Sequence, residues 1–471
     1  MRFTDFDYIL IGMKARPLFG LPIPLLTLLL FMACSREITS EIWLGLYLQG
    51  KKIGYQHIMV NRHDGGYLLR EDDLWRVAMY GSEKRLMSNS IEKTDADLNL
   101  KEFEFKLRTQ DQAVEARGWV WQDTLFVELS DGNGRRRISY PLGGKPLLTS
   151  LIAHAMFLTG KVKTGEFIVF DPSTFSLKEG KVEALGTERI EHRGRSLKCE
   201  TYMLEVAASR SKIWVHDRKI IREEAPMGIV AVEEPETLAV KGFEELVDLL
   251  SFYSIKVDTP LSEDVHYIKL ELQNIPTSNL DLEFGPQRVV EQGDTWAIVE
   301  YSAQGFADSL PNPNEFLKST PFVQVDAPEI QEVASKIVQG LDDDSAKAFA
   351  ILSWVFNELE KRPSVTLPSA VDVLKERYGD CNEHAVLFAA LARASGIPTE
   401  ILVGLVYQNG AYYYHAWNAV YVHGKWFFVD PIFFEFPAKA THLLLKRGGI
   451  DRQADIVPVV GRLKIKVLEA K

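Results

Sequence analysis

Three side chains in the C-terminal part of this sequence have the chemical types that nucleophilic catalysis requires. Cys381 offers a thiol, His415 offers a base that titrates near neutral pH, and Asp430 offers a carboxylate. A nucleophilic cysteine needs a base, and the base needs a group that fixes its tautomer. The elements that carry these residues must therefore bring them together.

Cys381 falls in the first turn of a predicted helix. Asp380 is placed as its N-cap and Glu383 at its third position, which is the pattern of a capping box. The apolar run 385–392 follows, and Gly396-Ile397-Pro398 ends the helix. A helix N-terminus presents free N–H groups that favour a thiolate. We therefore expect a buried helix that holds a thiol poised for ionisation.

The sequence around His415 and Asp430 predicts a β-hairpin with a tight turn at His423-Gly424. If Val422 faces Lys425, then His415 and Asp430 are diagonal neighbours on one face, with backbones about 7 to 8 Å apart. A slip of one residue would place the two side chains on opposite faces. The two strands are expected over residues 412–422 and 425–429.

Apolar residues at spacings of three and four predict helices ahead of the cysteine. The first carries Ile330, Val333 and Ile337, and the second runs from Phe349 to Leu359. A third is expected from Ser369, with Asp372 completing a capping box, to a C-terminal cap at Gly379.

Four consecutive blocks of this region resemble the transglutaminase-like superfamily, which has a papain-like thiol-enzyme fold. They are Tyr378-Gly-Asp-Cys-Asn-Glu-His-Ala385, Leu391-Ala-Arg-Ala-Ser-Gly-Ile-Pro398, Tyr414-His-Ala-Trp417 and Lys425-Trp-Phe-Phe-Val-Asp-Pro431. The resemblance covers about residues 325–435. It implies that Cys381 attacks an amide or ester carbonyl, that His415 exchanges the proton, and that Asp430 orients the imidazole.

The resemblance also implies a second donor for the tetrahedral oxyanion besides the N–H of Cys381. Trp354, Asn357 and Trp417 are candidates, and the sequence does not choose among them. His384, on the same helix as Cys381, is expected to have a supporting or solvent-facing role. The histidines, cysteines and aspartates have no recognised metal spacing, and no acidic loop has calcium spacing, so no metal and no cofactor is expected.

The composition of the 471 residues is that of a globular protein, with 46% hydrophobic and 25% charged residues and a net charge of -11. Nucleic-acid binding requires a concentrated surplus of Lys and Arg, so no nucleic-acid partner is expected. The three cysteines, at positions 34, 199 and 381, cannot form a disulfide framework for so long a chain, and Cys199 and Cys381 are expected to stay free.

Residues 1–34 read as an export signal, because Lys14 and Arg16 precede the apolar run 17–33. The run ends at Cys34 in a pattern that resembles a bacterial lipoprotein signal, and Met13 is an alternative start. We expect an exported cell-envelope protein that is anchored to the membrane through lipidated Cys34 or an uncleaved segment. Ordinary secretion stays open.

The predicted fold class is α+β. After the leader 1–34 we expect a β-rich domain over 36–245, a small β module or linker over 246–320, and a transglutaminase-like domain over 321–471 with helices packed on an antiparallel sheet. Two shorter helices are expected at 147–158 and 241–250. The predicted activity is that of an envelope cysteine peptidase or amidase acting on a peptide, protein or other amide. Protein cross-linking and non-catalytic binding are the alternatives, and the oligomeric state stays open.

Overall fold

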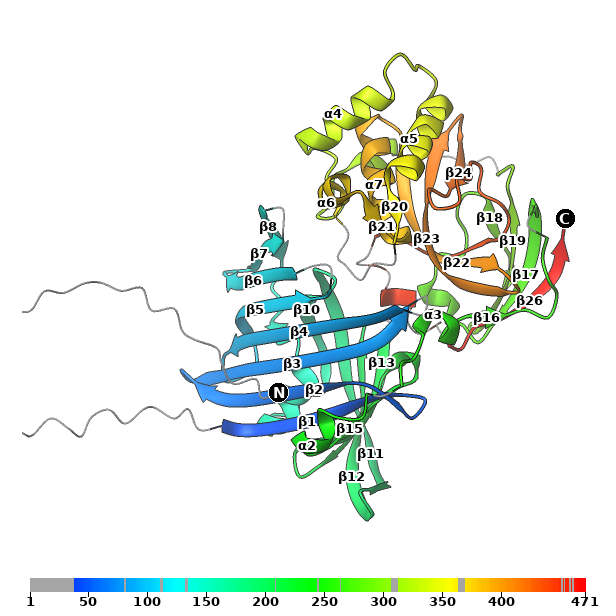
Figure 1. Ribbon diagram of the computed structural model, residues 1–471. Helices are drawn as coiled ribbons and strands as arrows, with labels where there is room; N and C mark the ends of the chain where they lie inside the picture. The colour runs from blue at the N-terminus through cyan, green and yellow to red at the C-terminus, as the bar shows by residue number, and fades with distance from the viewer. Residues whose placement is uncertain are drawn as a thin grey trace, which may run out of the picture. The chain divides into compact units, whose positions relative to one another are not determined.

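A computed structural model describes most of the chain from Ile38 to the C-terminus (Figure 1). The predicted leader, with Cys34, lies outside the described residues. The described ranges are 38–79, 82–110, 113–131, 134–207, 209–243, 245–262, 264–305, 312–362, 369–449, 452, 454–456, 459 and 461–471.

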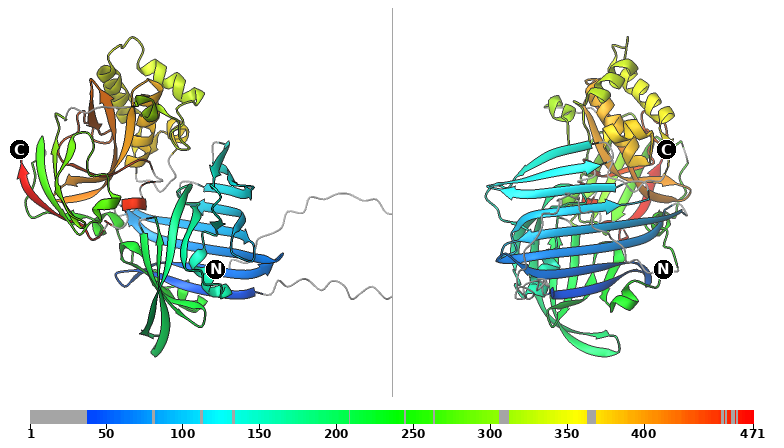
Figure 2. Two further views of the ribbon diagram at one scale, coloured as in Figure 1. Left: turned by 180° about the vertical axis from the view of Figure 1, so that it is seen from behind. Right: turned by 60° about the vertical axis from the view of Figure 1, so that its left-hand side comes forward.

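The N-terminal region is one 15-stranded sheet in the order β8-β7-β6-β5-β4-β3-β2-β1-β15-β14-β13-β12-β11-β10-β9. Its long strands curve along their length (Figure 2). Tight turns such as Gln49-Gly50 connect consecutive strands, and both turn residues have positive φ. The strands are β1 (Ile38–Leu48), β2 (Lys51–His63), β3 (Gly66–Met79), β4 (Ser82–Thr94), β5 (Leu100–Arg108), β6 (Ala113–Trp121), β7 (Thr124–Asp131), β8 (Gly134–Pro141), β9 (Leu147–Leu148), β10 (Gly165–Asp171), β11 (Ser176–His192), β12 (Arg195–Val206), β13 (Ser209–His216), β14 (Lys219–Glu224) and β15 (Ile229–Glu233).

Helix α1 (Ile152–Thr159) fills the core of this sheet, because its residues from Ile152 to Leu158 are all buried. A helix is therefore present within the region predicted over 147–158, but it begins later, at Ile152. Leu147 and Leu148 form β9 and pair in parallel with β10. The predicted helix over 241–250 was also wrong, since helical turns occur at α2 (Glu236–Ala239) and α3 (Leu249–Phe252) instead.

The described part of the C-terminal region contains three further sheets and four α-helices, and the smallest sheet is the parallel pair β20-β21. One sheet has the order β18-β19-β17-β26, and another has the order β16-β23-β22-β25 with β24 paired to β23. The elements are β16 (Ile255–Lys256), β17 (Tyr267–Gln273), β18 (Gln287–Gln292), β19 (Trp296–Ser302), α4 (Pro328–Ile337), α5 (Asp344–Glu358), β20 (Glu360–Lys361), α6 (Ala370–Glu376), β21 (Tyr378–Gly379), α7 (Cys381–Ala394), β22 (Thr399–Gln408), β23 (Ala411–Val422), β24 (Lys425–Val429), β25 (His442–Arg447) and β26 (Lys464–Ala470).

Helix α7 is the centre of the helical layer. Its residues from Glu383 to Arg393 are buried, and one hydrophobic cluster joins them to α4, α5, α6 and residues of β22, β23 and β24. A second cluster on the other face of β23 joins Trp417 and Ala419 to the four-stranded sheet. Strand β23 therefore lies between two cores, which fixes the direction of each of its side chains.

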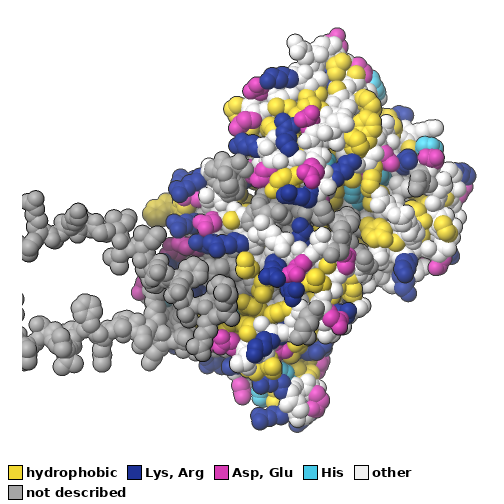
Figure 3. All heavy atoms as spheres, viewed as in Figure 1, with side chains coloured by type: hydrophobic (Ala, Val, Ile, Leu, Met, Phe, Trp, Pro, Cys, Tyr) yellow, Lys and Arg dark blue, Asp and Glu magenta, His cyan; other side chains and the backbone are white. Residues whose placement is uncertain are grey.

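The visible surface carries interspersed acidic and basic side chains, as expected for a mixed-charge protein (Figure 3). Among the described residues, no helix combines the length and hydrophobicity needed to cross a bilayer.

Candidate active site

The start of α7 is built as the sequence predicts. Asp380 Oδ1 accepts the Asn382 N–H at 2.8 Å, and Glu383 Oε2 accepts the Asp380 N–H at 2.9 Å, so the capping box is present. Cys381 is the first helical residue. A capped N-terminus fixes the backbone of this turn and therefore the position of the thiol.

The helix before it differs from the prediction. Helix α6 ends at Glu376, and Arg377 rather than Gly379 adopts the left-handed C-cap conformation, with φ 61°. Ser369 occupies the N-cap position but makes no capping hydrogen bond. Gly379 has another role: a Cβ there would lie 2.2 Å from Glu383 Cβ. Glycine is therefore required so that the capping side chain can approach the backbone before Cys381.

The hairpin register is confirmed. Val422 pairs with Lys425, and the ladder continues to Asn418 and Val429. His415 and Asp430 therefore lie on one face, and His415 Nε2 donates to Asp430 Oδ2 at 2.7 Å. The other ring nitrogen, Nδ1, is left for proton exchange.

Asp430 is fully buried and has partners on both oxygens. Oδ1 accepts the N–H groups of Ile432 at 2.7 Å and Phe433 at 3.1 Å. Oδ2 accepts from His415 and, at 2.8 Å, from His442 Nε2. Burial opposes ionisation, but the charge and hydrogen bond of His415 and the hydrogen bond of His442 outweigh it and hold the Asp430 pKa far below its usual range. The carboxylate is thus ionised and accepts four hydrogen bonds.

The Cys381 thiol lies beside the strand that carries His415, because the Ala416 N–H donates to it. Burial, followed by the negative charge of Asp380, raises the thiol pKa well above its usual value, whereas the Ala416 N–H lowers it. The expectation of a thiol poised for ionisation was therefore wrong in direction. Desolvation exceeds the effect of the helix N-terminus here, and the resting thiol is protonated.

Tyr414 is a further group near the thiol, and the sequence candidates did not include it. Its hydroxyl donates to Asn382 Oδ1 at 3.2 Å. Burial raises the Tyr414 pKa well above its usual value, and the next largest contribution is the neighbouring Cys381. Adjacent residues of a strand face opposite sides, so the place of Tyr414 immediately before His415 gave no sequence signal of this contact.

The three predicted oxyanion donors have different surroundings. Trp417 is buried, and its ring lies 6.0 Å from that of His415. Its Nε1 has no hydrogen-bond partner within the part of the chain that the structure describes. Trp354 packs under the Arg377 guanidinium at 4.6 Å. Asn357 is exposed, and its amide donates to Ser353 O of the same helix at 2.8 Å. The structure therefore brings Trp417 to the histidine.

His384 is buried rather than solvent-facing. Its Nδ1–H donates to Asp380 O at 2.8 Å, and no described residue forms a hydrogen bond with its Nε2. Burial is the main cause that lowers the His384 pKa. The neutral ring is thus bound to the cap that positions Cys381.

His442 was missed by the sequence reasoning. It begins β25, which pairs with β22 so that His442 faces Val406, and its side chain is fully buried. Gly404 of β22 allows this close packing, since a Cβ there would meet Leu443 O at 2.1 Å and the Trp417 ring at 2.9 Å. A lone histidine in an apolar run, His442-Leu-Leu-Leu445, gave no local signal of this contact.

His415, Asp430 and His442 are also the group of described residues whose donor atoms, within 4.8 Å of one another, could hold a metal ion. Zinc bonds of about 2.0–2.2 Å in tetrahedral geometry would separate ligand atoms by about 3.3 Å or more. The N–O distances of 2.7 and 2.8 Å are those of charge-assisted hydrogen bonds instead. The geometry fits a hydrogen-bonded trio better than a metal centre.

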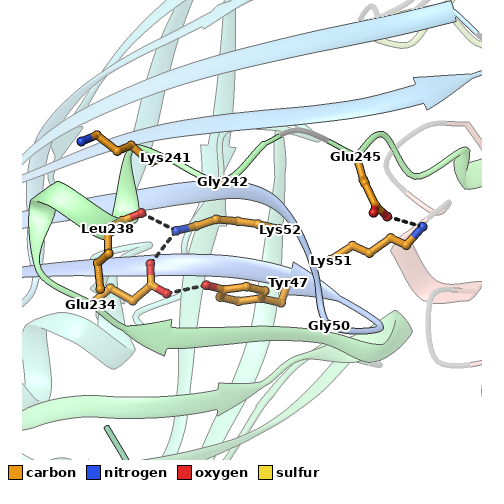
Figure 4. Close-up of a pocket in the computed structure, with 9 residues that line it drawn as sticks. All are labelled: Tyr47, Gly50, Lys51, Lys52, Glu234, Leu238, Lys241, Gly242 and Glu245. Atoms are coloured by element: carbon orange, nitrogen blue, oxygen red, sulfur yellow. Dashed lines mark hydrogen bonds and ion pairs between the residues drawn. The ribbon is translucent and has the colours of Figure 1, made fainter.

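The N-terminal sheet contains a separate pocket of about 520 Å³ (Figure 4). Lys52 lies in it with Nζ 2.6 Å from Glu234 Oε2 and 2.7 Å from Leu238 O, and the Tyr47 hydroxyl also donates to Glu234. These contacts form a largely buried ion pair that ties the β1–β2 hairpin to α2.

Comparison with known proteins agrees with this geometry. Residues 331–431 match the model of the transglutaminase-like superfamily. This chain therefore contains a transglutaminase-like domain, which holds Cys381, His415 and Asp430.

The chain is also similar to a kyphoscoliosis peptidase of Mus musculus, with 28% identity over 153 residues, 26% of this chain and 23% of the relative. It thus spans less than a quarter of that protein. Similar solved structures include the periplasmic domain of TgpA from Pseudomonas aeruginosa, with 17% identity, TM-score 0.30, and coverage of 39% of this chain and 73% of the other. A beta-barrel-like protein of DUF1849 from Brucella abortus has 13% identity, TM-score 0.33, and coverage of 41% and 94%.

Proposed function

We propose that this protein catalyses thiol-dependent acyl transfer, with Cys381 as nucleophile, His415 as general base and Asp430 as the group that orients His415. The reaction is hydrolysis of a peptide or other amide bond. The observation that carries the proposal is the hydrogen bond between the buried Asp430 carboxylate and His415 Nε2 at 2.7 Å. This bond directs the remaining ring nitrogen of His415 to proton exchange.

The proposed sequence of steps follows from these groups. His415 Nδ1 takes the thiol proton, and the sulfur of Cys381 attacks the substrate carbonyl. The backbone N–H of Cys381 and a second donor then stabilise the oxyanion, and His415 returns its proton to the leaving amine. Water hydrolyses the thioester. The Tyr414 hydroxyl and the unpartnered Trp417 Nε1 are the candidate second donors.

A thiol-directed electrophile tests the enzyme proposal before a substrate is known. Iodoacetamide should label Cys381 in preference to Cys199, which is buried and free. His415→Ala should slow the labelling of Cys381 by about a hundredfold at pH 7.5, because a positioned base contributes on the order of 10² to 10⁴. Labelling that is equal at both cysteines, or unchanged in the histidine variant, would contradict it and favour a non-catalytic binding module.

The group that accepts the acyl group from the Cys381 thioester distinguishes hydrolysis from cross-linking. If the reaction is hydrolysis, water should release a peptide bound to Cys381 as a thioester with a free carboxylic acid. Transfer to an added primary amine in preference to water would instead favour protein cross-linking, which shares every step up to the thioester.

The localisation is likewise a proposal, namely export to the cell envelope with Cys34 as the lipidated residue. Mass spectrometry of the membrane-associated protein should find a diacylglycerol-modified Cys34, and Cys34→Ser should release the protein from the membrane. An unmodified Cys34 in a membrane-bound chain would point to an uncleaved anchor instead.

A further inference from the structure

We propose that His442 is a positioning residue that carries both ring protons and, as a buried imidazolium, forms an ion pair with Asp430 that fixes this carboxylate beside His415. This inference deepens the proposed function, because it concerns the same site. It rests on the hydrogen-bond geometry around one imidazole ring.

Both nitrogens of His442 face acceptors. Nε2 lies 2.8 Å from the Asp430 carboxylate, and Nδ1 lies 3.1 Å from the Lys439 carbonyl oxygen. A carbonyl oxygen can only accept, and the ionised Asp430 can only accept. Each ring nitrogen must therefore carry a proton for both contacts to be hydrogen bonds.

The neutral forms of the ring fit less well. A neutral ring with its proton on Nε2 would direct the Nδ1 lone pair at the Lys439 oxygen, and the Thr441 hydroxyl is more distant at 3.4 Å. A neutral ring with its proton on Nδ1 would need Asp430 to be protonated. Asp430 Oδ1 already accepts two backbone N–H groups, which favours the carboxylate.

The charged groups around His442 agree with this assignment. Asp430 and Glu435 contribute negative charge, whereas the Lys439 ammonium is paired with Asp264 at 3.4 Å. Burial opposes protonation of His442, but the hydrogen bond and charge of Asp430 outweigh it and raise its pKa. The other ring contacts are Trp417 at 5.1 Å and His415 at 5.9 Å between centroids.

A cation at His442 changes what Asp430 does for His415. The Nε2 atoms of the two histidines share Asp430 Oδ2 as their acceptor. Without the His442 cation, the carboxylate would be held only by His415 and by the two backbone N–H groups on Oδ1. The ion pair with His442 therefore fixes the acceptor that orients the His415 ring.

Nitrogen NMR of the histidine rings tests the charge directly and needs no substrate. In the full chain, both His442 nitrogens should give protonated, imidazolium-type signals at pH 7, assigned by their loss in His442→Gln. A neutral ring at pH 7 would overturn the proposal. Signals that change on adding zinc and return with a chelator would overturn it in favour of a metal centre.

A second measurement follows the effect on His415. In a Cys381→Ala background, His442→Gln keeps an N–H donor toward Asp430 but removes the positive charge. The Nε2 proton of His415 should then resonate further downfield, because the Asp430 carboxylate no longer shares its charge with a cation and accepts more strongly from His415. A purely structural role would leave this resonance unchanged, which would overturn the proposal.

The matched control is His154→Gln in α1. His154 is also buried, but its Nε2 has no hydrogen-bond partner among the described residues, and desolvation lowers its pKa to about 4. This variant should leave the His415 proton resonance unchanged. If both NMR results hold and no peptide, amide or ester is turned over, the proposed enzymatic function fails while the assignment of His442 stands.

Discussion

Replacing Asp430 by Asn should destabilise the trio in a pH-dependent way. The amide oxygen of Asp430→Asn can still accept the two backbone N–H groups, but its NH₂ would face the Nε2–H groups of His415 and His442. Removing one partner of a buried ion pair costs about 3 to 5 kcal/mol. We therefore expect the free energy of local opening to fall by about 3 kcal/mol at pH 6.

The pH dependence follows from the raised pKa of His442. Because the folded-state pKa of His442 is raised, its protonation stabilises the fold fully below the unfolded pKa of about 6.5. This contribution is lost as the pH rises through the folded-state pKa. The Asp430→Asn variant lacks the carboxylate that raises the His442 pKa. The difference in stability between wild type and variant should thus be largest at pH 6 and shrink toward pH 9.5.

Hydrogen exchange measures this locally and avoids assuming two-state unfolding of a long chain. Amides of β25 should exchange on the order of a hundredfold faster in the variant than in wild type at pH 6, since about 1.4 kcal/mol corresponds to tenfold. Asp281→Asn is the control, because Asp281 accepts the Arg447 N–H at 3.0 Å and is partly exposed. A difference in β25 exchange that is the same at both pH values would refute the reasoning.

Three further substitutions test separate parts of the structure. Tyr414→Phe removes one partly buried hydroxyl, so it should lower kcat/KM by on the order of tenfold or more, as measured by steady-state kinetics. The same variant should change the free energy of unfolding by about 1 kcal/mol or less, as measured by thermal unfolding. Gly379→Ala should destabilise the start of α7 by about 2 kcal/mol or more, because its Cβ would meet Glu383 Cβ at 2.2 Å, as measured by chemical denaturation. Lys52→Met should destabilise the N-terminal sheet by about 3 kcal/mol, since it leaves Glu234 without its ammonium partner, as measured by exchange of β1 and β2 amides.

Each of these has a result that would contradict it. An unchanged kcat/KM in the tyrosine variant would remove the hydroxyl from the list of oxyanion donors. Combining Gly379→Ala with Glu383→Ala should not restore full stability, because alanine at 383 keeps the clashing Cβ and cannot form the capping hydrogen bond. Full restoration would show that the clash lies elsewhere. Lys51→Met is the control for Lys52, since Lys51 pairs with Glu245 at the surface and should cost less than about 1 kcal/mol.

The sequence by itself determined the features that depend on neighbours along the chain. The capping residues Asp380 and Glu383 place Cys381 in a first helical turn, because their hydrogen bonds span three residues. The tight turn at His423-Gly424 sets the register that brings His415 to Asp430, since a two-residue turn fixes which residues face each other. Both features are local, and both agree with the structure.

Tertiary structure alone decided the rest. His442 reaches Asp430 because β25 pairs with β22, and neither strand's sequence predicts this pairing. The thiol pKa rises rather than falls because packing around Cys381 removes more solvation than the helix terminus supplies, and packing depends on elements distant in the chain. Capping and turn chemistry can thus be read residue by residue, whereas the charge state of a buried group depends on every element folded against it.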